Sequence, residues 1–357
     1  MDDRHVSIEI LYDGVPLAWA SDLLESLSYT DNASGKSDDI TLTFCSRATD
    51  FLSTTGGFRF EREHDLDVTY YLHNWKKSGD KLRYHCGNFT LDTVRFTGSP
   101  RQCVIKGVSV PVAESFTTEN FSKTWGSITL RQIAWEMVQK YGMTDLFYWG
   151  PDPVISKVTQ DKKSDSTFLS EMCDKQGMFL KVYKKALVVF DKATYEARGI
   201  TAHFWEKDFD GQYEWDESLV GTYTGATISY TVPTKKKTTK GKQQIRAKQQ
   251  TKETTKQQVI NVTVGTPRRM LYINQKADSE AEAQRIAKAK VNVENEKACT
   301  VSFAAMEDPE VVASCNIELH DMGIMSGKYF VTKVTHNISG SNGSKMKVSG
   351  YRVFERL

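Results

Sequence analysis

Apolar and polar residues alternate with a period of two along the first part of the chain, as they do in β-strands with one buried face. Residues 6–10, 39–44, 88–96 and 102–110 follow this pattern. Glycine, aspartate and proline between these segments supply turn signals. The pattern predicts a first β domain over residues 1–115.

The middle of the chain changes to a helical spacing. Residues 128–141 place Ile133, Met137 and other apolar side chains on one face, and residues 165–176 form a second such segment that ends before a glycine. Two short alternating segments then predict a strand hairpin. We therefore expect an α+β insert domain over residues 116–205.

Strand-like alternation returns in residues 206–357 and continues to the end of the chain. A helix is predicted near residues 279–297, where Ser279 and Glu282 have the spacing of a capping box. This part is expected to form a second β domain.

The two β regions share a sequence pattern. Residues 87–94 and 327–334 both read G-x-[FY]-x-[LV]-x-x-V, and each is followed by [IV]-x-G-x-x-V. Unrelated hairpins can alternate alike, but two matched glycines at similar spacing favour a duplicated β domain. The candidate core of the repeat comprises Gly87, Phe89, Val94, Gly107, Gly327, Tyr329, Val334 and Gly350. The expected fold class is α+β, mainly β, with two similar tube-like β-barrel domains and a helical insert between them.

One segment of the second domain is strongly basic. Residues 235–258 carry nine Lys and Arg and one Glu, a charge of +8, so the remainder of the +2 chain carries 2 − 8 = −6. The segment has almost no large apolar residues and is predicted to be a mobile loop, over residues 234–258. A solvated tether and a weak phosphate-binding segment are both open interpretations. Its basic residues include Lys235, Lys236, Lys237, Lys240, Lys242, Arg246 and Lys248.

Four acidic residues also recur with a period of two: Glu61, Glu63, Asp65 and Asp67. If they belong to one strand, all four carboxylates lie on one of its faces. A solvated strand face is one interpretation. The other is a channel wall, where like charge repels a passing polyanion.

The sequence shows no catalytic signature. The GxSxG, HExxH and phosphate-loop motifs are absent, the histidines are scattered, and the six cysteines have no CxxC spacing. We therefore predict no catalytic residue, no cofactor and no metal site. Two acidic pairs, Asp216 with Glu217 and Asp308 with Glu310, leave glycoside hydrolysis open.

The sequence also bears on localisation. No apolar run reaches about 18 residues, so membrane insertion is not expected. The first ten residues lack the apolar segment of a signal peptide, which predicts a protein retained in the cytoplasm.

Several motifs resemble one known family. Residues 87–94 resemble the G-x-F-x-[LV]-D-x-V element of phage late control protein D and related tail hub proteins. Residues 125–134 resemble the helix entry that follows their first barrel, and residues 164–178 resemble their SD-x-x-FL helix and turn. Residues 327–336 are similar to hubs of PBSX-like prophages and phage-tail-like bacteriocins. The order of these motifs carries the resemblance.

The resemblance implies a structural baseplate hub of a contractile phage tail or phage-tail-like bacteriocin, assembled in the bacterial cytoplasm. It implies a homotrimer that contacts the hexameric tail tube protein, the trimeric central spike protein, the tape measure protein and other baseplate proteins. No catalytic residue comes with it, and the basic segment has no known counterpart in the family. A tail-associated cell-wall hydrolase and a nucleic-acid-binding protein are the alternative functions.

Overall fold

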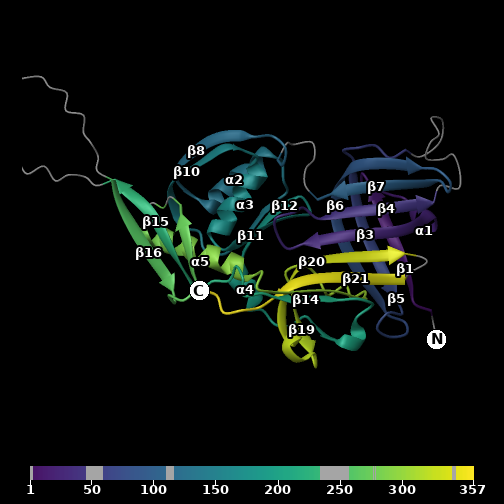
Figure 1. The fold of residues 1–357 in the computed structure, drawn as a ribbon. Coiled ribbons are helices and arrows are strands. Elements are labelled where there is room, and N and C mark those ends of the chain that lie inside the picture. Colours follow the sequence, from purple (N-terminus) through teal and green to yellow (C-terminus); the bar gives the residue numbers. More distant parts are fainter. Residues whose placement is uncertain are drawn as a thin grey trace, which may run out of the picture.

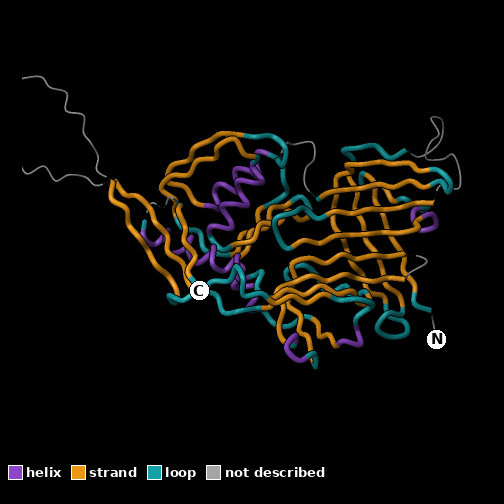
Figure 2. The backbone as a smooth tube through the Cα atoms, viewed as in Figure 1, coloured by secondary structure: helices purple, strands orange, loops and turns teal. Residues whose placement is uncertain are grey.

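The computed structural model describes residues 3–45, 59–109, 116–233, 257–275, 277, 279–339 and 343–357. A large antiparallel sheet lies on one side of the molecule, and an α+β region lies beside it (Figure 1). Strands hold 52% and helices 17% of the described residues. Figure 2 shows the strands gathered in the large sheet and the helices mainly beside it. The predicted class, α+β and mainly β, is therefore confirmed.

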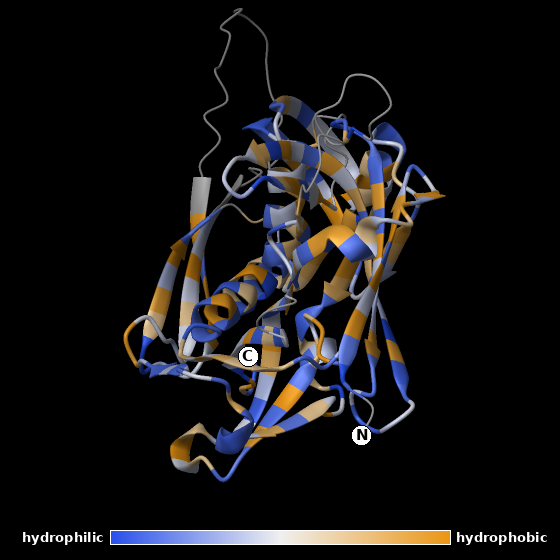
Figure 3. Ribbon diagram, turned by 90° about the vertical axis from the view of Figure 1, so that its right-hand side faces the viewer, coloured by the Kyte–Doolittle hydropathy of each residue, from blue (hydrophilic) through white to orange (hydrophobic). Residues whose placement is uncertain are grey.

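The first half of the sheet is built from the alternating segments at the N-terminus. Polar and apolar residues alternate along its strands (Figure 3). Many of the apolar residues are buried in one core cluster. Its elements are β1 (His5–Tyr12), β2 (Val15–Pro16), α1 (Ala20–Leu23), β3 (Leu24–Asn32), β4 (Asp39–Cys45), β5 (Asp65–His73), β6 (Lys81–Thr97) and β7 (Gln102–Val108).

The insert packs two helices against two small sheets around a core of its own. Thr129 forms the capping box at the start of the first helix, and Ser164 caps the second. The elements are β8 (Phe121–Thr129), α2 (Leu130–Lys140), β9 (Leu146–Trp149), β10 (Val154–Lys163), α3 (Asp165–Lys175), β11 (Met178–Tyr183), β12 (Ala186–Asp191) and α4 (Lys192–Glu196).

The second half of the sheet is interrupted by a smaller unit. In that unit α5 (Glu280–Asn295) covers a three-stranded sheet of β15 (Gly225–Pro233), β16 (Gln257–Gly265) and β17 (Met270–Asn274), and Ser279 caps the helix. The sheet strands are β13 (Ala202–Trp205), β14 (Glu214–Glu217), β18 (Cys299–Met306), β19 (Asn316–His320), β20 (Gly327–Ser339) and β21 (Gly343–Arg352). Short 3-10 helices cover Glu206–Asp208 and Gly323–Met325.

Both halves belong to one sheet of thirteen strands. Its order is β14-β18-β21-β20-β3-β4-β7-β6-β5-β1-β2, with β19 paired to β20 and β13 paired to β19. The path stays open at β14 and at β2 within the described residues. The two tube-like β domains are not closed barrels within the described residues, and β3 of the first half pairs directly with β20 of the second.

Candidate functional site

The two halves of the sheet have the same strand order. The two-residue β2 is left aside, and the remaining six strands of each half are numbered by their order along the chain. Across the sheet, both halves then run first, fourth, fifth, sixth, third and second. In the first half this is β1-β5-β6-β7-β4-β3, and in the second it is β13-β19-β20-β21-β18-β14. One difference is that β1 and β5 are antiparallel, whereas β13 and β19 are parallel.

The candidate core residues of the repeat occupy matching places on these strands. Phe89 and Tyr329 are fully buried, on β6 and β20. Gly87 and Gly327 precede them by two residues, and both have a positive φ, of 124° and 137°, which glycine adopts without steric cost. In its pairing with the next strand, β7 or β21, each strand also carries one register break, after Leu91 in the first half and after Val331 in the second.

Gly107 and Gly350 are the cross-strand partners of the residues at these breaks. A Cβ on residue 107 would lie 2.8 Å from the Cβ of Phe89. On residue 350 it would lie 2.4 Å from the backbone oxygen of Phe330. Both glycines are therefore required by close approach of neighbouring strands. Val94 and Val334 follow the breaks and pair with Ile105 and Val348.

Gly350→Ala is expected to lower the free energy of unfolding by about 1–3 kcal/mol, because the new methyl group meets backbone that has no rotamer to change. Gly199→Ala is the control, since a Cβ there has no heavy atom within 4 Å. It should stay within about 0.5 kcal/mol of the wild type in urea denaturation. Equal effects of both substitutions would contradict the close approach.

The junction between the halves is an antiparallel strand pair that runs from Ser26 opposite Ser339 to Asn32 opposite Lys333. Tyr29 of β3 lies opposite His336 of β20 in this pair. Both are fully buried, and His336 Nδ1 lies 2.6 Å from a Glu307 carboxylate oxygen.

Tyr70 donates a hydrogen bond of 2.9 Å to the same Glu307 oxygen. Burial and the nearby carboxylate raise the pKa of Tyr70 well above its usual value, so it stays a donor. These contacts join the two halves at the junction, while Glu307 Oε2 and His336 Nε2 are buried without a hydrogen-bond partner among the described residues.

The junction residue Tyr29 has an equivalent in the second half, Trp215, which lies on the edge strand β14. Trp215 of β14 lies opposite Val301, as Tyr29 lies opposite Ile40. Both aromatic residues contact the buried ring of their own half, because Trp215 Nε1 donates to the Tyr329 hydroxyl at 2.9 Å and the Tyr29 ring packs on Phe89.

The equivalent of His336 is Phe96 of β6. Phe96 lies opposite Cys103, and His336 lies opposite Met346, at the same distance from the register break. His336 is buried under the junction, whereas Phe96 is 38% exposed. Among the described residues no strand pairs with the far edge of β14 or with residues 93–97 on the edge away from β7.

A three-residue charge cluster fastens the insert to both halves of the sheet. Lys181 of β11 forms an ion pair with Asp31 and another with Asp38, with its Nζ 3.1 Å from Asp38 Oδ2. Asp31 also accepts a hydrogen bond of 2.8 Å from the backbone of Ala313 in the second half.

All three charged side chains of this cluster are nearly or fully buried. Burial raises the pKa of Asp38 to about 7, although Lys181 opposes the shift. Burial lowers the pKa of Lys181, but attraction by Asp31 and Asp38 outweighs burial and the net shift is upward.

The predicted acidic strand face is corrected in part. The strand begins at Asp65, so Glu61 and Glu63 precede it, and Glu63 lies in a turn with a φ of 72°. Asp65 and Asp67 do lie on β5. Asp65 forms an ion pair with Lys185 at 2.6 Å, and His85 contacts Asp67 at 2.8 Å.

The acidic pairs that left hydrolysis open are not arranged as catalytic pairs. Asp308 and Glu310 both lie 3.4 Å from the ammonium of Lys76. Asp216 and Glu217 are consecutive residues of an exposed strand, so their side chains point to opposite faces.

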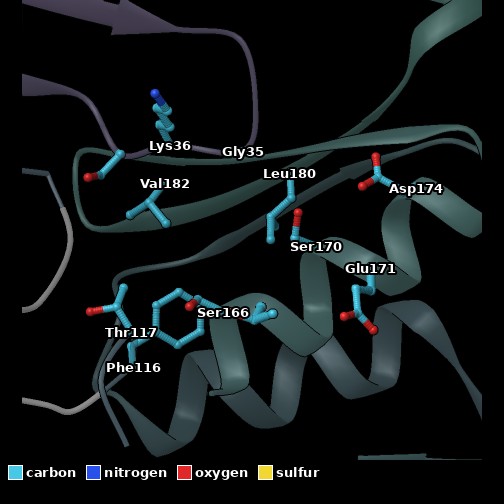
Figure 4. A pocket seen from close by; sticks show the side chains of 12 residues that line it. Gly35, Lys36, Phe116, Thr117, Ser166, Ser170, Glu171, Asp174, Leu180 and Val182 are labelled. Carbon is cyan, nitrogen blue, oxygen red and sulfur yellow. The ribbon is translucent and has the colours of Figure 1, made fainter. Parts of the chain in front are cut away.

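The cleft of Figure 4 is a cavity of about 300 Å³ between α3 and the loop after β3. Its lining contains no histidine or cysteine among the described residues. Its two carboxylates, Glu171 and Asp174, are engaged by Lys163 and Lys192.

The structure also brings together residues that the sequence left apart. His203 and His320 are separated by more than a hundred residues, yet their rings meet beside Glu318. The pairing of β13 with β19 is not visible in the local sequence pattern, so the sequence did not predict this contact.

The basic residues of the predicted loop lie outside the described residues: Lys235, Lys236, Lys237, Lys240, Lys242, Arg246 and Lys248. No described helix is long and apolar enough to span a bilayer.

Comparison with solved structures places the fold among phage tail proteins. The chain aligns with the 43 kDa tail protein of prophage MuSo2 from Shewanella oneidensis at a TM-score of 0.66 and 12% identity, covering 98% of each chain. A tail protein from Neisseria meningitidis gives 0.66 and 9%, covering 97% of this chain and 96% of the other. Prophage tail protein gp18 from Listeria monocytogenes gives 0.57 and 10%, covering 96% and 94%.

An Escherichia coli component of the type VI secretion system, described as structurally similar to bacteriophage T4 tail proteins, aligns with a TM-score of 0.53 at 10% identity. The alignment covers 99% of this chain and 78% of that one. No protein-family profile and no curated protein matches the sequence. These identities are low, so the likeness establishes the fold: the chain has the fold of phage tail proteins.

Proposed function

We propose that this chain is a structural tail component, the homotrimeric baseplate hub of a contractile phage tail or phage-tail-like bacteriocin. The observation that carries the proposal is the identical strand order of the two halves of one sheet. Three chains in a closed ring present six similar β units around one axis. Such a ring offers a six-fold surface to a tail tube protein and a three-fold surface to a central spike protein.

The free edges of the sheet support this ring. Within one chain, β3 pairs with β20. The equivalent contact between chains pairs β14 of one copy with β6 of the next. The pairing places Trp215 opposite Phe96, which covers the exposed ring of Phe96, as Tyr29 covers His336.

The same register places Asp216 opposite Arg95. Both side chains are exposed in the single chain, and neither makes an ion pair among the described residues. Opposite charges directly across a strand pair are favourable. A contact of β14 with β6 is heterologous and closes into a ring when the rotation per chain is one third of a turn.

The proposed role is structural, with contacts to the tube, the spike, the tape measure protein and other baseplate proteins. It places the protein in the baseplate of a particle assembled in the bacterial cytoplasm. Each chain would contribute two β units to the ring wall, one of residues 1–115 and one of residues 206–218 with 298–357, and the insert of residues 116–205 would lie outside it.

Native mass spectrometry of the full chain tests the assembly. We expect a complex of three chains, and we expect it to bind a trimeric spike protein encoded with it. A monomer at all concentrations, or a dimer, would contradict the hub role. A trimer that binds no spike protein would support the ring but contradict the proposed role of joining the tube to the spike.

A further inference from the structure

We propose that His203, Glu318 and His320 form a binding site for a divalent transition metal ion, for which Zn²⁺ is the best match. This site lies on β13 and β19, apart from the proposed contact of β14 with β6, and adds a ligand to the proposed hub. Among the described residues, these three are the group of His, Cys, Asp and Glu whose ligand atoms lie within 4.8 Å of one another.

The strand register explains why the three side chains meet. β13 and β19 run parallel, with His203 opposite Glu318 and Trp205 opposite His320. Glu318 and His320 are two residues apart on one strand, so their side chains share a face. His203 is on the neighbouring strand and points to that same face. The pairing of the two strands therefore fixes the spacing of the three side chains.

The donor atoms form a triangle of the size that zinc requires. His203 Nδ1 lies 2.8 Å from His320 Nε2, and Glu318 Oε2 lies 3.4 Å from the first and 3.3 Å from the second. Ligands about 2.05 Å from a tetrahedral ion are about 3.3 Å apart. The two distances from Glu318 match this value. The two imidazole nitrogens would have to move apart by about 0.5 Å to bind the ion.

The ligand types favour a transition metal over Mg²⁺ or Ca²⁺. Two imidazoles with one carboxylate suit Zn²⁺, Co²⁺, Ni²⁺ and Cu²⁺, whereas the hard cations require oxygen ligands. Three protein ligands leave a fourth position for water or for a donor from another molecule. The side chains are between 32% and 49% exposed, so an ion can enter from solvent.

A second contact holds one of the imidazoles in place. The Trp205 ring stacks on His320 with centroids 4.9 Å apart, and Trp205 Nε1 donates to Asp321 at 3.2 Å. A bound ion would link β13 to β19, a short pair of four residues at the end of a side branch of the sheet. These two strands are parallel, whereas the equivalent strands of the first half, β1 and β5, are antiparallel.

Titration of the untagged full chain with Zn²⁺ alone, followed by calorimetry, tests the site. We expect one ion per chain, and the visible spectrum of a four-coordinate centre when Co²⁺ replaces Zn²⁺. His203→Ala and His320→Ala should each weaken Zn²⁺ binding at least tenfold. Zn²⁺ should raise the Tm of the wild type but not of these variants, because an ion that binds the folded state stabilises it.

The His5→Ala variant is the matched control, since His5 stacks on His73 in a second histidine pair, with centroids 4.2 Å apart. It should bind Zn²⁺ like the wild type. Equal metal-free Tm values will show that the variants are folded. If the wild type binds no ion, or if His320→Ala binds it equally well, the proposal is wrong. The short nitrogen contact is then a hydrogen bond between two imidazoles of complementary tautomers.

Discussion

Asp216→Arg and Arg95→Asp are each expected to abolish the trimer, and the double variant is expected to restore it. Each single substitution replaces an attraction by a repulsion at every contact of the ring. A cross-strand pair is worth about 0.2–1 kcal/mol, so the change costs up to about 2 kcal/mol per contact. Three contacts then lose up to about 6 kcal/mol, or about four powers of ten in the trimerisation constant.

Light scattering across a dilution series measures this effect. Arg101→Asp is the matched control, because it makes the same charge change in the turn between β6 and β7, away from the free edge. It should leave the trimer intact. Single variants that remain trimeric would reject the pairing of β14 with β6 without rejecting the trimer. Recovery in the double variant is specific to this register, because a shift by one residue separates the two charges.

The sequence predicted the elements and the repeat because both leave local signals. Alternation marks the strands, and the glycines at 87, 107, 327 and 350 mark backbone that a side chain would obstruct. The helical spacing of residues 128–141 predicted α2, which spans Leu130–Lys140. The same alternation also misled, since Glu61 and Glu63 follow the period of β5 without belonging to the strand. Glu63 has a positive φ, which is incompatible with a regular strand. The acidic side chain itself does not indicate this backbone conformation.

Pairings between distant segments could not be predicted in this way. The junction of β3 with β20 joins strands some three hundred residues apart, and only the fold shows that the halves share one sheet. The unit of β15, β16, β17 and α5 has its own core but the same alternation as its neighbours, so the sequence merged it with the second β domain. The meeting of His203 with His320 depends on a parallel pair that no spacing reveals.

Lys181→Met is expected to lower the free energy of unfolding by about 3–5 kcal/mol at pH 8, because it leaves Asp31 and Asp38 buried without their cation. Urea denaturation of the full chain measures the change. Lys297→Met is the control, since Lys297 forms an exposed ion pair with Glu294 and such pairs contribute about 0–1 kcal/mol.

The loss should be smaller at pH 5. Burial raises the pKa of Asp38 to about 7, so the folded chain holds a proton that the unfolded chain releases near pH 4. The stability that this proton contributes is present at low pH and is lost as the pH rises through the folded pKa. Without Lys181 the pKa of Asp38 rises further, and the cost of ionising it grows between pH 5 and pH 8. The pKa of Lys181 itself is raised, so it stays charged across this range.

Adding Asp38→Asn to Lys181→Met tests the cause. The double variant should recover part of the stability at pH 8 and lose most of the pH dependence, because the titrating carboxyl is gone. An equal loss at both pH values, or no recovery in the double variant, would assign the effect to packing of the lysine stem. The cluster contacts both halves of the sheet and the insert, since Lys181 is on β11, Asp31 is on β3 and Asp31 binds Ala313. Its loss should therefore loosen the insert against the ring wall while the strand pairs within each half remain.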